Sequence, residues 1–379
     1  MGNRIRYPVL LALTGIFLLA AGPIRAQQGG NLDEISRLVE GAMPSAITDD
    51  NTELVNNLMG AQLGDPLSKT FDYNRVRAAL FGRTAPSLEP DCLRKFTPNG
   101  EADPGDCIAT AGSEGGAGAH KVLRFSKNMG LGNVRFQSRP PAPKDDEETD
   151  PQALAVKLSD QDAYAAGVKF LNETLGVPME EMALPPAGVP LPVKSLAIGG
   201  GDEQGQRLPA VFVQKVLIVR RGLKLPKPIP IMDPKTQQVF ELSMVPAPGE
   251  AWVALGDPSP NDPDPATRMG LRGAMVADWQ ELRPNPNLTK AKTRSQLVQE
   301  VAERLRTASE TTPSLIKILI GLSSESKGTF STMLPAIQVF AASAERDPTE
   351  EEQQKVAGKP TAGQVFFVPL VEVGEQSER

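Results

Sequence analysis

The sequence predicts an α+β protein built from tandem units, each with one helix packed on a curled antiparallel sheet, after a loop-rich N-terminal region. A clear amphipathic helix pattern occurs twice in the C-terminal part of the chain. Each time, several strand patterns follow it without another helix between them. Consecutive strands without intervening helices pair antiparallel, and the preceding helix covers one face of their sheet.

Residues 1–26 are expected to be a cleavable signal peptide. Arg4 and Arg6 give it a positive start, and a short apolar stretch follows from Val9 to Ala21. A membrane-spanning helix needs about 20 apolar residues, so cleavage before Gln27 is preferred over a lasting anchor. We therefore expect the mature chain to be exported to the periplasm or the medium, with no membrane span.

Residues 27–138 are expected to form the loop-rich N-terminal region, with short helices and a hairpin. Asn31 suits a helix N-cap, and acidic residues follow it in the first turn, where they favour the helix dipole. Residues 84–119 predict loops because Gly, Pro and Asp are frequent there. The other expected elements are a helix over Thr52–Met59 and a hairpin of Lys121–Phe125 and Asn133–Gln137.

Proline and clustered charge predict a linker at 139–151. The first helix-plus-sheet unit, 152–285, then begins with the clearest helix pattern of the chain. Ser159 and Asp162 resemble a capping box, and Gly176 is the expected stop. The strand patterns of this unit are Ala210–Arg220, Gln238–Met244, Ala251–Leu255 and Leu271–Trp279.

The second helix-plus-sheet unit, 286–379, has the same order of elements. Ser295 is the expected N-cap of its helix. Pro369 lies inside the last strand pattern and predicts an edge strand or a bulge, because proline cannot donate to a ladder. An apolar edge strand can accept a partner's strand, although we prefer a core strand whose edge a loop covers. The strand patterns are Leu315–Leu322, Leu334–Ala341 and Val365–Val371.

The composition argues against several classes of function. The chain has 40 basic and 46 acidic residues and a net charge of −6, whereas binding of nucleic acid or anionic lipid relies on clustered Lys and Arg. Aromatic residues make up only 5% of the chain, which disfavours surfaces that stack sugars or bases. We therefore expect no nucleic acid among the partners.

Cys92 and Cys107 are the two cysteines of the chain. Export would place them in an oxidising compartment, so a structural disulfide is the preferred interpretation. Metal binding and redox chemistry are the alternatives. Their spacing is not C-x-x-C, and with a single histidine in the chain they do not complete a zinc site. We expect no metal and no cofactor.

His120 is the single histidine, and this limits the possible catalytic sites. A serine nucleophile would need it as a base, and Ser113 lies seven residues before it. The surrounding Ala111–Gly115 departs from the G-x-S-x-G motif at its first position. A pair of carboxylates remains possible, but the sequence selects no pair. We therefore assign no catalytic residue.

Two further motifs favour loops over ligand sites. Asp257, Asp262 and Asp264 could supply oxygen ligands to calcium, but the prolines between them fit no EF-hand loop, so a solvated turn is preferred. The glycines of 199–205 and 130–132 lack the rest of a phosphate-binding motif and are interpreted as turns.

Three stretches resemble the PepSY and thermolysin-propeptide type domains of exported bacterial proteins. They are Ser159–Leu175, Val211–Leu223 and Ala251–Asp257, and they cover about half of the chain together with the elements around them. Those domains place one helix against a few antiparallel strands. The tight Gly-x-Pro turn common there is stretched here to Gly222–Pro226, and no peptidase domain follows. The resemblance implies a protein-binding or inhibitory module.

The sequence thus favours an exported, non-catalytic protein that binds a protein or peptide partner, with an inhibitory or propeptide-like role as one form of it. An exported hydrolase using paired carboxylates, or Ser113 with His120, is the first alternative. A structural protein of the cell envelope is the second.

Overall fold

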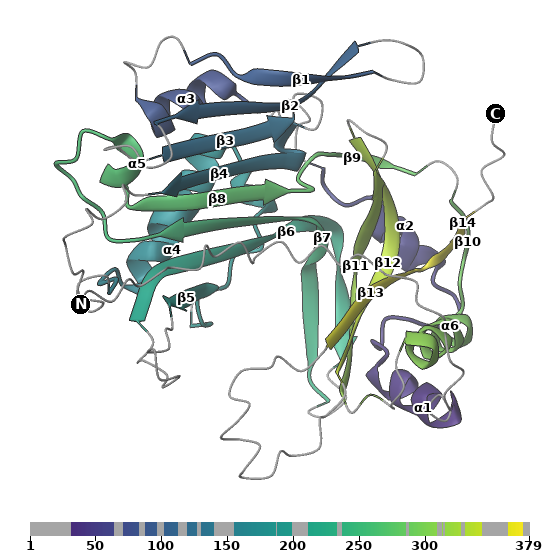
Figure 1. Ribbon diagram of the computed structural model, residues 1–379. Coiled ribbons are helices and arrows are strands. Elements are labelled where there is room, and N and C mark those ends of the chain that lie inside the picture. Colours follow the sequence, from purple (N-terminus) through teal and green to yellow (C-terminus); the bar gives the residue numbers. More distant parts are fainter. Residues whose placement is uncertain are drawn as a thin grey trace, which may run out of the picture.

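The computed structural model describes fifteen parts of the chain (Figure 1). The expected signal peptide 1–26 and almost all of the expected linker 139–151 lie outside them. The described residues are 32–63, 71–82, 88–96, 102–112, 120–126, 130–139, 155–186, 188–198, 211–232, 237–285, 288–308, 313, 315–326, 330–342 and 363–373.

An eight-stranded antiparallel sheet, here called the large sheet, dominates the molecule (Figure 1). Its strand order is β1-β2-β3-β4-β8-β7-β6-β5. Strands β4 and β8 are neighbours although the expected linker separates them in the chain, so residues before and after 139–151 share one sheet. The strands are β1 (Asp91–Phe96), β2 (Ala102–Ala111), β3 (His120–Ser126), β4 (Asn133–Arg139), β5 (Val193–Ile198), β6 (Val211–Met232), β7 (Val239–Leu255) and β8 (Leu271–Ala277).

Strands β6 and β7 are long enough to take part in two layers. The first part of β6 pairs with both β5 and β7, and its register with β7 shifts between Arg220 and Gly222. Beyond this shift the two strands continue as a hairpin ribbon that leaves the large sheet and passes beside β11 (Figure 1). The hairpin therefore connects the two halves of the molecule.

A second sheet, here called the small sheet, follows that ribbon. Its strands β11, β12 and β13 pair antiparallel in this order, and β9 pairs parallel with the beginning of β12. A separate pair of short strands, β10 and β14, lies beside it. The bounds are β9 (Glu281–Pro284), β10 (Leu288–Ala291), β11 (Leu315–Ser326), β12 (Phe330–Ala342), β13 (Gly363–Pro369) and β14 (Val371–Val373).

The helices divide between two hydrophobic cores. Helices α1, α2 and α6 bury Val39, Leu58 and Val301 against the small sheet and the ribbon. Helices α3 and α4 and a π-helical turn bury Leu80, Leu171 and neighbouring residues against the large sheet. The helices are α1 (Leu32–Ala42), α2 (Thr52–Met59), α3 (Tyr73–Phe81), α4 (Asp160–Lys169), α5 (Pro265–Arg268) and α6 (Arg294–Ala308), with the π turn η4 (Phe170–Leu175) and the 3₁₀ turns η2 (Gly130–Gly132) and η5 (Met179–Glu181).

Tandem units of one helix on one sheet are therefore the wrong fold class for this chain. The large sheet takes strands from both sides of the linker, and β6 and β7 belong to both layers. The loop prediction for 84–119 is also wrong, since this segment contains β1 and β2. The glycines and prolines there hid these strands, because the pairing of β1 with β2 and of β2 with β3 is a tertiary contact that local propensity does not report.

Local signals at helix ends were more reliable. Ser159 Oγ accepts the backbone N–H of Asp162 at 3.0 Å, and Gly176 adopts the left-handed conformation that ends the helical segment. The expected cap at Ser295 is shifted to Thr293. Thr293 Oγ1 accepts the N–H of Gln296, whose side chain accepts the N–H of Thr293 in return.

Candidate functional site

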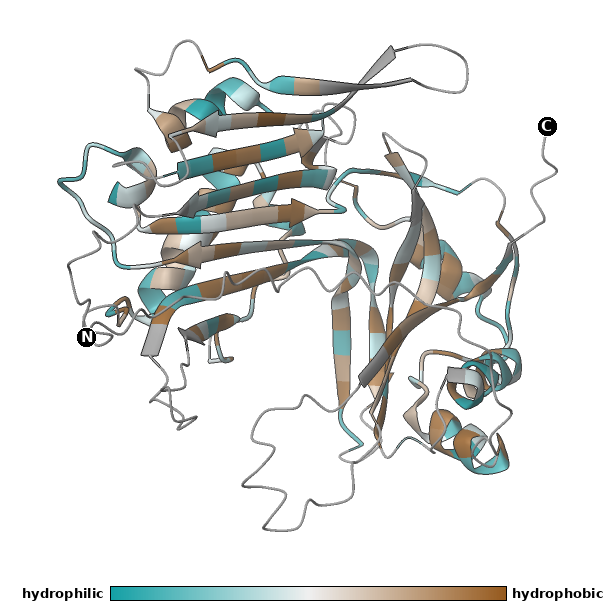
Figure 2. Cartoon of the chain, viewed as in Figure 1, coloured by the Kyte–Doolittle hydropathy of each residue, from teal (hydrophilic) through white to brown (hydrophobic). Residues whose placement is uncertain are grey.

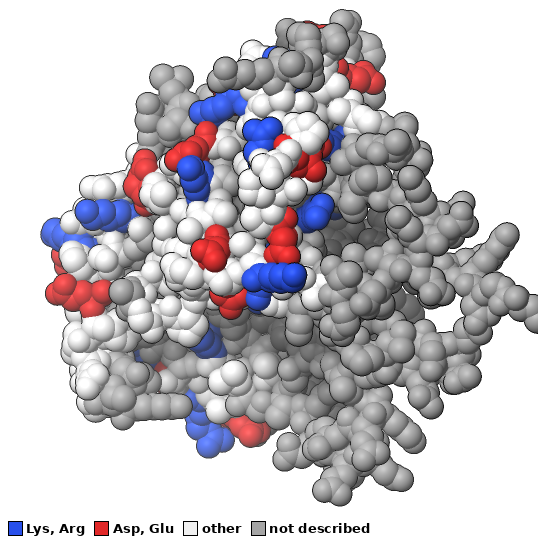
Figure 3. All heavy atoms as spheres, turned by 90° about the vertical axis from the view of Figure 1, so that its left-hand side faces the viewer, with Lys and Arg blue, Asp and Glu red and all other residues white. Residues whose placement is uncertain are grey.

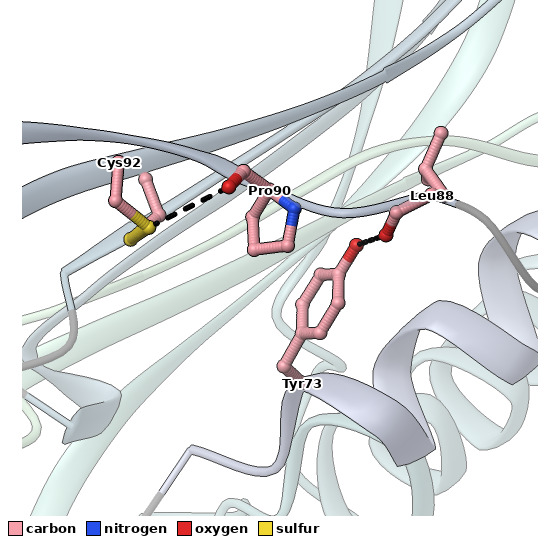
Figure 4. The surroundings of a disulfide bond; sticks show 5 residues. Tyr73, Leu88, Pro90 and Cys92 are labelled. Carbon is pink, nitrogen blue, oxygen red and sulfur yellow. Dashed lines mark hydrogen bonds between the residues drawn. A yellow bond between two sulfur atoms is a disulfide. The ribbon is translucent and has the colours of Figure 1, made fainter.

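The predicted disulfide is present and fastens the outermost strand of the large sheet. Cys92 of β1 and Cys107 of β2 face each other in the register, with 4.0 Å between their Cα atoms. Cys107 is fully buried. Figure 4 shows the adjoining chain, in which the Tyr73 hydroxyl donates to the carbonyl of Leu88 at 2.6 Å. The disulfide therefore joins two paired strands at a buried position, as expected of a structural bridge.

The candidate catalytic histidine lies on the large sheet. His120 is the first residue of β3, is partly exposed, and pairs with Arg139 of β4. Ser113 lies outside the described residues, as do the glycines of 199–205. The glycines of 130–132 form the 3₁₀ turn η2.

The carboxylates of the three aspartates considered for calcium accept hydrogen bonds within the protein. Asp257 Oδ1 accepts the N–H groups of Lys157 and Leu158, each at 2.8 Å. Asp264 caps α5 and lies 2.6 Å from the buried ammonium of Lys121, while Asp262 accepts the N–H of Asp264. No group of three or more His, Cys, Asp or Glu in the described ranges is arranged to hold a metal ion.

A buried polar group lies where the ribbon leaves the large sheet. We call Glu181, Arg221, Trp279 and Gln280 the junction cluster. Arg221 Nε donates to Glu181 Oε2 at 2.8 Å, and Trp279 Nε1 donates to the same oxygen at 3.0 Å. Arg221 Nη1 donates to the carbonyl of Gln280 at 2.9 Å. All four residues are at most 2% exposed, so the cluster lies in the interior.

The junction cluster links the two sheets. Gln280 lies between β8 and β9, and its side-chain amide donates to Ser331 Oγ on β12 of the small sheet. Burial lowers the pKa of Arg221, and the charge of Glu181 and its hydrogen bond oppose this shift. Arg221 Nη2 has no hydrogen-bond partner within the described part of the chain. The cluster has no exposed reactive group and is a structural junction.

Sequence reasoning did not find the junction cluster. Its signals were present: Arg221 interrupts a long apolar strand pattern, and Trp279 is one of two tryptophans in the chain. The partner of Arg221 is 40 residues away in a 3₁₀ turn, however, and no local pattern identifies it.

The most exposed apolar residues of the small sheet lie on its outer face. Leu315 is 64% exposed, Val365 is 54% exposed and Phe367 is 40% exposed. In the register, Val365 lies beside Phe340 of β12, and Phe367 lies beside Gln338. These side chains alternate along β13 with Phe366 and Val368, which pack into the core. Figure 2 shows β13 mainly in brown, the colour of hydrophobic residues.

Strand β13 also ends the small sheet, as Pro369 predicted. Within the described ranges it pairs with β12 on one side, and no strand pairs with its other side. The N–H of Leu370 donates to Pro335 of β12, so alternation directs the backbone groups of Val365 and Phe367 away from β12. Arg304 of α6 confirms this direction, since its Nη1 donates to the carbonyl of Phe367 at 2.8 Å.

The other strands at the ends of the sheets contain charges, whereas β13 does not. Lys194 is exposed on β5, Lys317 is exposed on β11, and β1 contains Asp91, Arg94 and Lys95. Charged side chains on an edge strand discourage pairing with another chain. The sequence of β13, Gly-Gln-Val-Phe-Phe-Val-Pro, contains no charged residue, and the charge at this edge is Arg304 of α6, which donates to Phe367. The edge of β13 is therefore the candidate binding surface.

Compared with known proteins, the chain matches no family model, no curated protein and no solved structure. No helix in the described ranges is long and apolar enough to cross a membrane. On the face shown in Figure 3, positive and negative side chains are interspersed and do not gather by sign.

Proposed function

We propose that the protein is an exported, non-catalytic binding protein that takes up an extended strand of a polypeptide at the edge of β13. The observation that carries this proposal is an apolar, uncharged strand at the end of the small sheet, with Val365 and Phe367 exposed. An added strand would satisfy the outward backbone groups of β13 and cover part of these side chains.

Export is supported by the signal-like segment 1–26 and by the Cys92–Cys107 disulfide. Disulfides persist in oxidising compartments and are rare in the cytosol. The resemblance to PepSY and thermolysin-propeptide type domains favours the same class of function, a module that binds or inhibits a protein.

A photocrosslinking residue placed at Val365 in the exported protein tests the proposal. We expect a covalent adduct with a polypeptide, identified by mass spectrometry, because this side chain would lie beside the added strand. Val189, at 48% exposure away from the small sheet, is the matched control position. Equal labelling from both positions, or none from Val365, would contradict the proposed function.

A further inference from the structure

We propose that the strand taken up by β13 is β13 of a second copy of this chain, antiparallel about a twofold axis at Phe366. This inference deepens the proposed function and rests on it. The joined sheets would form one continuous sheet in the order β11-β12-β13-β13-β12-β11.

The alternation of side chains restricts the register. A twofold axis perpendicular to the sheet keeps the two cores on the same side, so outward-facing residues must lie opposite outward-facing residues. Phe366 is the middle of the seven-residue strand. With the axis at Phe366, every residue from Gly363 to Pro369 finds a partner. Val365 then lies opposite Phe367 of the second copy, an aromatic and β-branched pair that occurs twice.

The backbone supports the same register. Val365 and Phe367 direct their N–H and C=O groups outward, so they can form a hydrogen-bonded pair across the axis. The Phe367 carbonyl already accepts from Arg304, but a carbonyl oxygen has a second lone pair. At the end of the strand, the carbonyl of Pro369 can accept a hydrogen bond from the N–H of Gly363 of the second copy. Proline has no backbone N–H, so no donor is left unpaired at Pro369.

Charge favours a second copy of β13 over self-pairing of the other edge strands. Antiparallel self-pairing of β5 or β11 would bring Lys194 or Lys317 toward its own copy, and like charges across a strand pair are destabilising. Strand β13 has no charge to oppose its copy. The neighbouring Arg304 is paired with Glu300 at 2.7 Å, which offsets part of its charge, although Glu300 also pairs with Lys292.

Two variants of the mature protein, each with one cysteine added to the bridged Cys92–Cys107 pair, test the register. Cα atoms of a hydrogen-bonded pair are about 5.5 Å apart, within reach of a disulfide, whereas diagonal neighbours are about 7–8 Å apart. We therefore expect a mixture of Val365→Cys and Phe367→Cys to form a disulfide-linked dimer under mild oxidation. Each variant alone would remain unlinked. Leu315→Cys mixed with Phe367→Cys is the control and should also remain unlinked.

Sedimentation equilibrium gives an independent measurement that needs no cysteine. We expect the unmodified protein to form dimers and Val365→Lys to weaken them about tenfold or more, because it removes an apolar pair and adds charge beside the axis. Circular dichroism of each variant checks that it is folded.

The outcomes separate this inference from the proposed function. A monomer at all concentrations, with no disulfide between the Val365→Cys and Phe367→Cys variants in their mixture, would overturn the second-copy inference. If the crosslinker at Val365 then captures a different polypeptide, the proposed function stands without it. If that crosslinker captures nothing, both are rejected.

Discussion

The carboxylate of Glu181 lies 2.8 Å from Nε of Arg221, and both side chains are sealed from solvent. Glu181 comes from a 3₁₀ turn, whereas Arg221 occupies the position of β6 where its register with β7 shifts. Opposite charges in such a place depend on each other, because neither can be hydrated once its partner is lost. The pair therefore holds the strand where one layer of the protein continues into the other.

Replacing Glu181 with Gln should destabilise the protein by about 3–5 kcal/mol, the usual cost of leaving one member of a buried ion pair uncompensated. Arg221 would retain its charge at a position with 0% exposure. Chemical denaturation followed by tryptophan fluorescence measures the loss, and Trp279 lies beside the pair as a reporter.

The double replacement Glu181→Leu with Arg221→Met distinguishes the charge effect from loss of packing. It removes both charges, so it should be more stable than Glu181→Gln. A double variant as unstable as the single one would show that shape, and not the unpaired charge, determines the cost.

Gly249 should tolerate no side chain. Its φ is +136°, and an added Cβ would lie 2.9 Å from Cδ of Arg221. We expect Gly249→Ala to lower the free energy of unfolding by about 1–3 kcal/mol. The matched control is Gly41→Ala in α1, where an added Cβ meets nothing within 4 Å and helix propensity predicts a gain of about 0.5–1 kcal/mol. The same sign of change in both variants would refute this explanation.

The disulfide should contribute about 3 kcal/mol, since it closes a loop with a sequence separation of 15. Cys92→Ala with Cys107→Ala should therefore lower the denaturation midpoint, and reduction of the unmodified protein should have the same effect. The intact mass before and after reduction shows whether the bridge forms. Two free thiols in the purified, non-reduced protein would reject it.

Signals that depend on neighbouring residues predicted the structure well. The Ser159 cap, the Gly176 stop and the hairpin of β3 and β4 are all present, because each is determined within a few residues. The cysteine pair was also predictable, since two cysteines allow one pairing. Pro369 identified an edge strand through the single donor that proline lacks.

Long-range pairing was not predictable in the same way. Nothing in the sequence near Asn133 indicates that it pairs with Ala277 of β8, on the far side of the linker, and such contacts are typical of sheets with non-local topology. The ribbon formed by β6 and β7 was likewise interpreted as separate strands, because prolines at 226, 228 and 230 interrupt the pattern. The candidate binding edge depends on both local and long-range features: Pro369 predicts it, and the topology leaves it at the end of the sheet.

Ionisation of Tyr73 should lower the stability of the protein in alkaline solution. Burial raises the pKa of Tyr73 above its ordinary value of 10.0, and Glu89 adds to this effect while Arg77 opposes it. The folded state thus retains the phenolic proton at a pH where the unfolded state loses it. The stabilisation that protonated Tyr73 provides is complete at pH values below the pKa of Tyr73 in the unfolded state. It is lost as the pH rises through the pKa of Tyr73 in the folded state.

Phenolate absorbance measured during an alkaline titration should show one ionisation step above the ordinary tyrosine pKa, and Tyr73→Phe should remove this step. If the unmodified protein shows all of its tyrosine ionisation at the ordinary pKa, unchanged by that variant, this would contradict the partly buried environment of the hydroxyl that donates to Leu88.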